Sequence, residues 1–176
     1  GLLDLKPTRL VLDTGAAHPS PHYKRFLAAV KRCGATCRVA HRGQTIDLGG
    51  GALAQVLSPG PEHAHEDLNN RSVVLRITYR SAAILLAADA GVEAEACMLE
   101  AGLPLRSQVL QVGHHGSDDS TSPEWLAAVA PGLAIISCGR SNSYGHHSSE
   151  VVSRLRSAGA RVYRTDQDGA VTITTN

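Results

Sequence analysis

The sequence predicts one domain in which α-helices and β-strands alternate around a shared sheet. The chain has 176 residues, of which 43% are hydrophobic, and this supplies enough apolar surface for a sizeable core. Short β-branched runs alternate with longer segments of helical periodicity, which is typical of strand–helix–strand units. Because such units leave the carboxyl ends of their strands at one edge of a sheet, we expect polar residues that follow those strands to converge.

Composition narrows the class of protein. Aromatic residues make up 3% of the chain, so the core must be built from Leu, Val, Ile and Ala, and the formal charge of +1 neither indicates nor excludes a nucleic-acid partner. The sequence contains no run of 18 apolar residues and no export signal, so we expect a soluble fragment. The chain starts at Gly1 without a methionine, which indicates a piece of a longer protein whose other parts carry the membrane segments or address.

The four cysteines are too few for a disulfide-stapled fold. Cys97 and Cys138 lie in apolar settings and are expected to be buried as small hydrophobic residues. Cys33 and Cys37 flank a predicted helix-to-strand turn, where they could form a local disulfide or stay reduced.

In the first half of the chain, a capped helix lies between two predicted strands, and a hairpin follows. Ser20 and Pro21 are typical of a helix start and Gly34 of a helix end. The glycines 49–51 interrupt an apolar run and predict a hairpin at a sheet edge. The predicted elements are a strand at 9–12, a helix at 20–31, a strand at 37–40 and hairpin strands at 46–48 and 52–57.

The second half predicts another hairpin and then alternating helices and strands. The turn at Arg80 and Ser81 joins two apolar runs, Ser122 and Pro123 start a helix, and Gly159 ends one. The predicted elements are strands at 73–79 and 82–88, a helix at 92–99, a strand at 109–112, a helix at 122–129, a strand at 134–137, a helix at 149–156, and closing strands at 161–165 and 170–174 around a turn at 168–169.

Three of these strands end in residues that can bind metal or transfer protons. Asp89 follows one, His114 and His115 follow the next, and His146 and His147 lie in the loop after the third. A divalent ion held by a carboxylate and a neutral imidazole would account for Asp89 and one histidine, and would lower the pKa of a bound water. One Asp and one or two His cannot hold two ions.

Structural roles are the alternatives for the same residues. Asp89 has the residue type and position of a helix N-cap. The pair His114–His115 could be structural, and in an extended chain its two side chains would point to opposite sides, so that one at most serves a given site.

A second metal-like pattern lies upstream. Residues 63–67 have the H-x-H-x-D spacing of a two-metal hydrolase, but Leu68 stands where a histidine should follow. The segment also follows Pro59-Gly60-Pro61 rather than a buried strand. We therefore predict a solvated loop here.

Five segments together resemble a known family. In order and spacing, residues 69–72 (NNRS), 86–90 (LAADA), 112–117 (VGHHGS), 142–146 (NSYGH) and 163–169 (YRTDQDG) are similar to the C-terminal metallo-β-lactamase-like domain of the ComEC/Rec2 family, the bacterial membrane channels that take up DNA in natural transformation. The resemblance covers nearly the whole chain. It implies an α+β fold, a four-layer αββα sandwich forming a single domain over residues 1–176, with a two-metal site that binds manganese or zinc.

The resemblance also implies roles for individual residues. Asp89 matches the bridging carboxylate and His115, with His114 as the alternative, matches the late metal-binding histidine. His146 matches a catalytic residue beside the scissile phosphate, as proton donor or oxyanion stabiliser. Residues implied to bind substrate or order the loops are Asn69, Asn70, Ser72, Ser117, Arg140, Asn142 and Tyr144.

The function implied is that of a metal-dependent nuclease that hydrolyses the DNA strand that is not imported. Its partners would be DNA and the rest of the channel with its membrane segments, on the extracytoplasmic side of the bacterial cytoplasmic membrane and without a small organic cofactor. The family's H-x-H-x-D-H motif would lie just upstream of Gly1, so the fold would be partly truncated at its N-terminus. We therefore expect this fragment to bind metal weakly and to be inactive.

Two other functions are compatible with the residues. One is a related metallo-phosphodiesterase acting on a small substrate, which would share the Asp and His-His-Gly pattern. The other is a catalytically inactive DNA-binding module, in which Arg71, Arg140 and Arg164 would contact phosphates.

Overall fold

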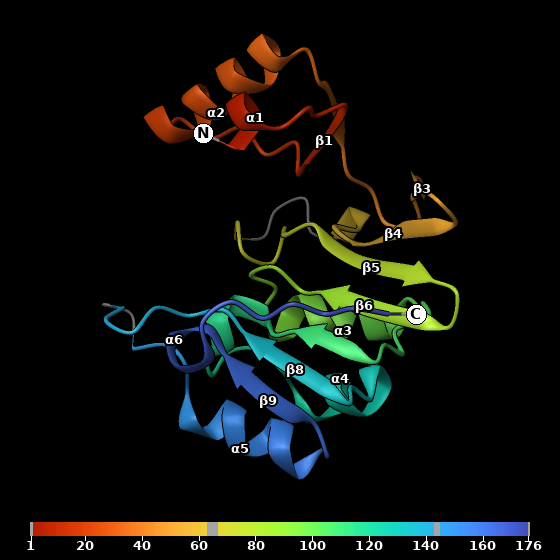
Figure 1. The fold of residues 1–176 in the computed structure, drawn as a ribbon, viewed down its shortest axis with the longest axis vertical. Helices are drawn as coiled ribbons and strands as arrows, with labels where there is room; N and C mark the ends of the chain where they lie inside the picture. The colour runs from red at the N-terminus through yellow and green to blue at the C-terminus, as the bar shows by residue number, and fades with distance from the viewer. Residues whose placement is uncertain (1, 63–66, 143–144, 176) are drawn as a thin grey trace. The chain divides into compact units, whose positions relative to one another are not determined.

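The structure, a computed structural model, describes residues 2–62, 67–142 and 145–175. Backbone contacts divide the chain into two compact units, Gly1–Ala40 and His41–Asn176. Figure 1 shows the elements of each unit in chain order. No helix in the described part of the chain is both long enough and apolar enough to cross a membrane.

The first unit contains two helices and a pair of parallel strands. Its elements are α1 (Leu2–Leu5), β1 (Leu10–Asp13), α2 (Pro21–Cys33) and β2 (Thr36–Val39), and α1 was not predicted. The predicted caps of α2 are confirmed, because the Ser20 hydroxyl accepts a hydrogen bond from the Tyr23 amide at 3.1 Å and Gly34 has a φ of 72°. Cys33 and Cys37 are free thiols, so the disulfide that the sequence left open is not formed.

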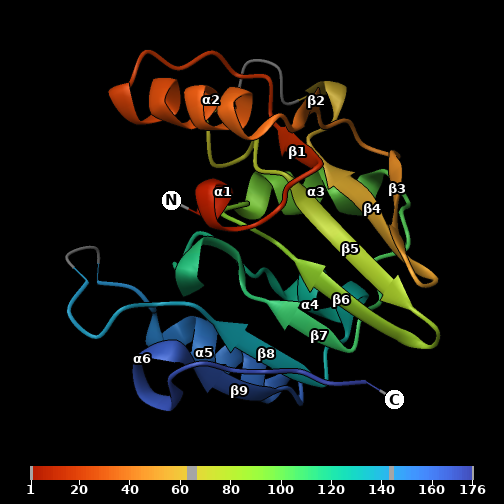
Figure 2. The same cartoon turned by 45° about the horizontal axis from the view of Figure 1, so that its top comes forward.

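The second unit is built on a seven-stranded sheet (Figure 2). The strands follow one another in sequence order: β3 (Thr45–Gly49), β4 (Ala52–Ser58), β5 (Val74–Tyr79), β6 (Ala82–Leu86), β7 (Val109–Gln111), β8 (Leu133–Ile136) and β9 (Arg161–Arg164). Neighbouring strands are antiparallel from β3 to β6 and parallel from β6 to β9. The predicted edge hairpin is β3–β4, and the parallel half confirms that β6, β7 and β8 end at one edge.

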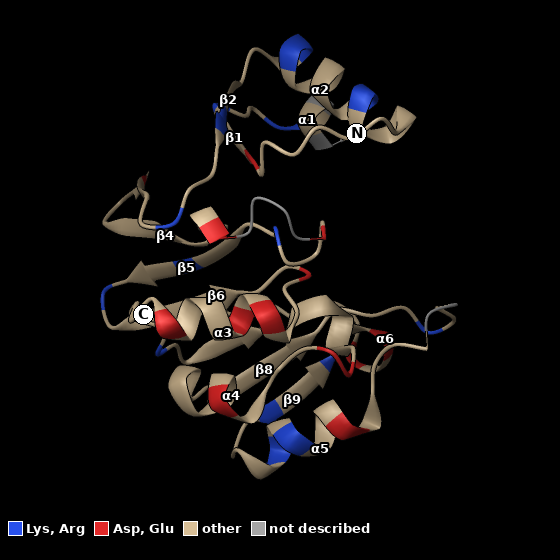
Figure 3. Cartoon of the chain, turned by 180° about the vertical axis from the view of Figure 1, so that it is seen from behind, with Lys and Arg blue, Asp and Glu red and all other residues tan. Residues whose placement is uncertain are grey.

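Three helices share one core with the sheet. Buried side chains of α3 (Val92–Glu100), α4 (Pro123–Val129) and α5 (Ser149–Ser157) pack with those of the strands, and Trp125 and Leu110 are among the largest of them. Acidic residues gather on α3 and basic residues on α5 (Figure 3). Burial of this apolar surface at about 25 cal/mol per Å² holds the helices on the sheet and so fixes the loops between them.

The predicted closing strand at 170–174 is wrong. Residues 165–168 form a short helix, α6 (Thr165–Asp168), and the described residues after it are not in a strand. The Asp168 carboxylate accepts a hydrogen bond from the Arg164 amide at 2.8 Å, which occupies the last amide of β9. Residues 170–174 line a pocket together with Leu133, Ile135 and Tyr163 of the sheet, so they lie beside the sheet but do not pair with it as a strand.

Asp89 is not the cap of α3. The N-cap position is Gly91, which has an extended conformation and no side chain to form a capping hydrogen bond. The Asp89 carboxylate is therefore available for another role.

Candidate metal centre

The candidate site lies where β6, β7 and β8 end. Asp89 follows β6, the histidine pair follows β7 in a short 3-10 segment, η2 (Gly113–Gly116), and Ser137 follows β8. Because these strands are parallel neighbours, their carboxyl ends bring the three segments together. Figure 1 shows these ends at the same edge of the sheet.

Two side chains fix the position of Asp89 through the backbone amides of Ala88 and Asp89. Ala88 before it has a φ of 51°, an unusual value for alanine, and its amide donates to the Gln111 side chain at 3.0 Å. The Asp89 amide donates to the Ser72 hydroxyl at 3.2 Å. Ser72, which the family resemblance connects with substrate, thus contacts the Asp89 backbone, and Gln111 is a positioning residue that the sequence did not indicate.

The histidine pair is not extended. His114 and His115 have φ values of 46° and 56°, in the left-handed region. The expectation that an extended pair would point to opposite sides does not apply, because a left-handed turn removes that alternation. Both rings instead lie near His146, with ring centroids 5.3 Å from His114 and 6.3 Å from His115.

Glycines make this turn possible. A Cβ at Gly113 would lie 2.8 Å from the Ala90 carbonyl oxygen, closer than a side chain can approach. Gly116 has a φ of 78°, and a Cβ there would lie 3.0 Å from the Cβ of His147. The buried Ser120 hydroxyl lies 3.0 Å from the Gly113 and Ser117 carbonyl oxygens and can donate to either.

His115 and Asp89 face each other across the site. The Nε2 atom of His115 lies 3.5 Å from Oδ1 of Asp89, and both side chains are about half exposed. The Nδ1 atom of His115 lies 2.7 Å from the Ser137 carbonyl oxygen, which can only accept, so Nδ1 carries the hydrogen. In the neutral ring the lone pair is then on Nε2, directed toward the carboxylate, as metal-binding histidines are commonly arranged.

His114 has different partners. Its Nδ1 lies 3.0 Å from the Asp119 carboxylate, and its Nε2 lies 3.5 Å from the Asn69 side-chain nitrogen. The ring is therefore oriented by Asp119, a residue that the sequence did not single out. Asp89 pairs with His115 rather than with His114.

Asn142 holds the segment that carries His146. Its side-chain nitrogen donates to the carbonyl oxygens of Gly139, at 2.9 Å, and of His146, and its oxygen accepts from the His146 amide at 2.9 Å. A cavity of about 330 Å³ lies beside these residues, lined by His115, Ser137, Cys138, Gly139, Asn142 and His146. Tyr144, predicted to contact substrate, lies outside the described residues, as do His63 and His65 of the upstream pattern.

The other predicted substrate residues are engaged with the protein. Asn70 is buried, where its side chain accepts from the Gly91 amide and donates to the carboxylates of Asp67 and Glu93. Ser117 is buried, and its hydroxyl lies 3.5 Å from the Asp118 carboxylate. The Arg140 guanidinium donates to the Asp166 carbonyl at 2.7 Å.

Asp89 and His115 fit one divalent ion that a carboxylate and an imidazole share. In the part of the chain that the structure describes, no third Cys, His, Asp or Glu joins this pair in a compact ligand group. The described residues thus account for two ligands and not for the set that two ions require.

Comparisons with known proteins identify the relatives of the chain. No known protein-family profile matches it. It is 33% identical over 167 residues to ComE operon protein 3 of Bacillus subtilis, a match that covers 94% of the chain and 21% of that protein. The chain is a homologue of the ComEC/Rec2 competence proteins.

Further relatives agree with this assignment. Competence protein ComA of Neisseria gonorrhoeae is 40% identical over 111 residues, covering 62% of the chain and 16% of the relative. Recombination protein 2 of Haemophilus influenzae is 37% identical over 119 residues, covering 68% and 15%. The chain thus spans about a fifth or less of the length of the ComEC/Rec2 relatives it matches.

A solved structure confirms the predicted fold class. The CmlA β-hydroxylase E377D mutant, a protein of the metallo-β-lactamase fold, superimposes with a TM-score of 0.57 at 15% identity, covering 89% of the chain and 38% of that protein. At this identity the likeness concerns the fold alone. The ComEC homologue is therefore an α+β protein of the metallo-β-lactamase fold.

Proposed function

We propose that this chain forms part of a metal-dependent nuclease site that cleaves DNA during DNA uptake. The observation that carries the proposal is the approach of His115 Nε2 to Asp89 Oδ1, with the other imidazole nitrogen fixed by a backbone carbonyl. The competence relatives support DNA as the substrate class. The proposed location is the extracytoplasmic side of the cytoplasmic membrane, in association with the rest of the channel.

The proposal gives each residue of the site a separate role. Asp89 and His115 bind a divalent ion, manganese or zinc, which when bound supplies a Lewis acid and lowers the pKa of water. His146, beside both histidine rings, donates a proton or hydrogen bond to the phosphate. Asn142 keeps His146 in place through the hydrogen bonds on either side of it.

In this proposal, residues beside the metal ligands contact the phosphate. The His114 ring is oriented by Asp119, and the exposed Asn69 lies beside its Nε2 atom. We assign His114 and Asn69 to substrate contacts, a role that the family resemblance also implies for Tyr144. Asn70, Ser72, Ser117 and Arg140 are assigned to ordering the loops, because their side chains already contact other parts of the protein.

Substitution of the metal ligands in the full-length natural protein tests the proposal. Asp89→Asn and His115→Ala should each lower Mn²⁺-dependent cleavage of labelled DNA by at least about 100-fold, because each removes a ligand. His146→Gln should lower cleavage by about 10² to 10⁴ while Mn²⁺ still binds. His41→Gln is the control, since His41 precedes the edge strand β3, and it should leave cleavage unchanged. Full cleavage by Asp89→Asn would refute the assignment.

Three measurements separate the proposed function from its alternatives. Single-stranded DNA should be cleaved in preference to a small chromogenic phosphodiester; the reverse preference would favour the small-substrate hydrolase.

Residues 1–176 alone should bind Mn²⁺ weakly and leave DNA intact. Robust cleavage by this fragment, abolished by His63→Ala, would assign the metal motif to residues 63–67 instead. DNA binding that falls steeply with salt and ignores a chelator, without cleavage, would favour the inactive binding module.

A further inference from the structure

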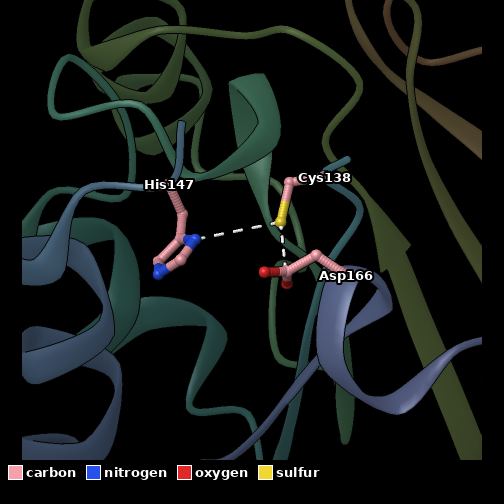
Figure 4. A group of neighbouring side chains, drawn as sticks. All are labelled: Cys138, His147 and Asp166. Atoms are coloured by element: carbon pink, nitrogen blue, oxygen red, sulfur yellow. Dashed lines mark hydrogen bonds between the residues drawn. The ribbon is translucent and has the colours of Figure 1, made fainter. Parts of the chain in front are cut away.

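Cys138, His147 and Asp166 form a compact cluster next to the candidate metal centre. They come from the end of β8, the loop before α5 and the start of α6, and their side chains turn toward one another (Figure 4). The Cys138 sulfur lies 3.8 Å from Nδ1 of His147 and 3.2 Å from Oδ1 of Asp166. All three potential ligand atoms lie within 4.8 Å of one another, and each residue is partly buried.

We propose that these three residues bind a zinc ion at a site separate from that of Asp89 and His115. Thiolate, imidazole and carboxylate are the ligands that zinc takes in proteins. With Zn–S of about 2.3 Å and Zn–N or Zn–O of about 2.0 to 2.1 Å, tetrahedral angles place the sulfur about 3.6 Å from each other ligand atom. The observed 3.8 and 3.2 Å lie on either side of this separation, and the nitrogen and oxygen ligand atoms lie within 4.8 Å of each other.

The protonation states of two ligands already suit a cation. Burial, together with the nearby Arg164, lowers the pKa of His147, so its imidazole is neutral near pH 7. The pKa of Asp166 falls to about 2, chiefly through its hydrogen bonds with the Arg164 guanidinium, so it stays ionised. Arg164 can remain as the outer partner that orients the carboxylate.

Cys138 must lose its proton when the ion binds. Burial raises the pKa of its thiol, as does the hydrogen bond to Asp166. Zinc replaces this proton: a Zn–S bond forms, the S–H bond breaks, and one proton passes to solvent. Without metal, Cys138 is therefore a protonated, uncharged thiol. The cluster should bind zinc more tightly as the pH rises, because binding releases this proton.

The geometry does not match a cysteine nucleophile. In such a site the acidic residue orients the histidine and the histidine activates the thiol. Here Asp166 contacts the sulfur itself, and the pKa of the thiol is raised rather than lowered. A metal site uses all three side chains as they are placed.

The cluster is open to solvent on the side of His147. An open depression of about 520 Å³ is lined by His147 and Arg164 together with residues of α5. Zinc bound here would join the end of β8 and α6 to the loop in which His147 follows His146. It is next to the candidate centre, since the Ser137 carbonyl that holds His115 directly precedes Cys138.

Cobalt substitution of the 176-residue chain tests the site, because Co²⁺ bound to a thiolate gives a charge-transfer absorption that Asp89 and His115 cannot produce. The band should appear in the wild type and in Asp89→Asn, and disappear in Cys138→Ser. Zinc competition should show affinity reduced at least about 100-fold in Cys138→Ser and His147→Gln. Cys97→Ser, another partly buried cysteine, is the control and should keep the band. A band that survives in Cys138→Ser, or no band in the wild type, overturns the proposal.

A measurement without mutation covers the case in which a variant does not fold. Zinc should slow alkylation of Cys138 in the wild type, followed by mass spectrometry of peptides, and leave exposed Cys37 equally reactive. Unchanged alkylation of Cys138 at saturating zinc overturns the proposal. Because this readout follows one thiol, its result is independent of whether the chain cleaves DNA.

Discussion

The geometry of the candidate site depends on the backbone conformation of three individual residues. Ala88, His114 and His115 all have positive φ, a conformation that costs a non-glycine residue about 1 to 3 kcal/mol. They are held there by hydrogen bonds, among them the one from the His114 amide to the Ala88 carbonyl at 2.9 Å. Such strain at adjacent strand ends is typical of functional sites, and here it turns His115 toward Asp89.

Gly113→Ala should damage this turn. The added Cβ would meet the Ala90 backbone oxygen, which cannot move aside as a side chain could. We expect the free energy of unfolding to fall by about 1 to 3 kcal/mol, measured by urea denaturation. Gly139→Ala is the matched control, because Gly139 has no described neighbouring atom within 4 Å of an added Cβ and should change stability by less than about 0.5 kcal/mol. Equal stability of the two variants would contradict the prediction.

A buried carboxylate links helices at the element scale. Glu95 of α3 is 1% exposed and accepts hydrogen bonds from the amides of Thr121, at 2.5 Å, and Ser122, at 2.8 Å, where α4 begins. Arg154 of α5 donates to the Thr121 carbonyl at 2.7 Å, so all three helices meet at this point. Glu95 thereby anchors the loop that follows the histidine turn.

Glu95→Gln should destabilise the protein although it removes a buried charge. The amide nitrogen of glutamine cannot accept, so the backbone amide of Thr121, which is buried, or that of Ser122, which is partly buried, loses its partner at a cost of about 1 to 3 kcal/mol. Thermal and urea unfolding at pH 7 measure this loss. Glu124→Gln, at the first turn of α4, provides a control on an exposed carboxylate and should be nearly neutral. Unchanged stability of Glu95→Gln would show that the two hydrogen bonds contribute little.

The same residue predicts a pH dependence. Burial raises the pKa of Glu95 above its ordinary 4.5, against the opposing effects of the two backbone amides and Arg154. A raised folded-state pKa contributes stability below pH 4.5 that is lost as the pH rises through the folded value. The stability advantage of the wild type over Glu95→Gln should therefore be larger at pH 4 than at pH 8, and an advantage that grows with pH would contradict the direction of the shift.

In the molecule as a whole, the stability of the second unit depends mainly on the apolar face of the sheet that the helices cover. Leu110 lies in β7, between two parallel neighbours, and is fully buried against the helices. Leu53 lies in β4 near the antiparallel edge and is 43% exposed. The same side chain thus occupies opposite environments in a single sheet.

Leu110→Ala should lower the free energy of unfolding by about 2 to 5 kcal/mol, because it removes buried surface and leaves a cavity. Leu53→Ala should lower the free energy of unfolding by less than about 1 kcal/mol, because much of the Leu53 side chain stays in water in the folded state. Urea denaturation followed by circular dichroism measures both. A larger loss for Leu53→Ala would indicate that the helix-covered face is not the main core.

Most elements could be predicted from local sequence. The caps Ser20 and Ser122 and the terminator Gly34 act within a few residues of their own positions, so their effect is visible in the chain itself. The segment 170–174 was predicted wrongly because its alternating pattern suits a strand, whereas a strand also needs a hydrogen-bonded partner strand. The described residues after α6 have no such partner. Glu95 and Gln111 could not be found as site-holding residues, since their partners lie 23 to 27 residues away.

The order of the elements, the strand ends that precede Asp89, His115 and His146, and the family could all be predicted from the amino-acid sequence. Local hydrogen bonding and hydrophobic periodicity encode the elements, whereas the family was indicated by five short motifs. Only the tertiary structure decided that His115 rather than His114 faces Asp89, and that Cys138, His147 and Asp166 meet. The residues in these pairings are up to 28 positions apart in the sequence, and parallel strands and left-handed turns bring them together. Their proximity in space is set by packing of the whole fold and not by neighbouring residues.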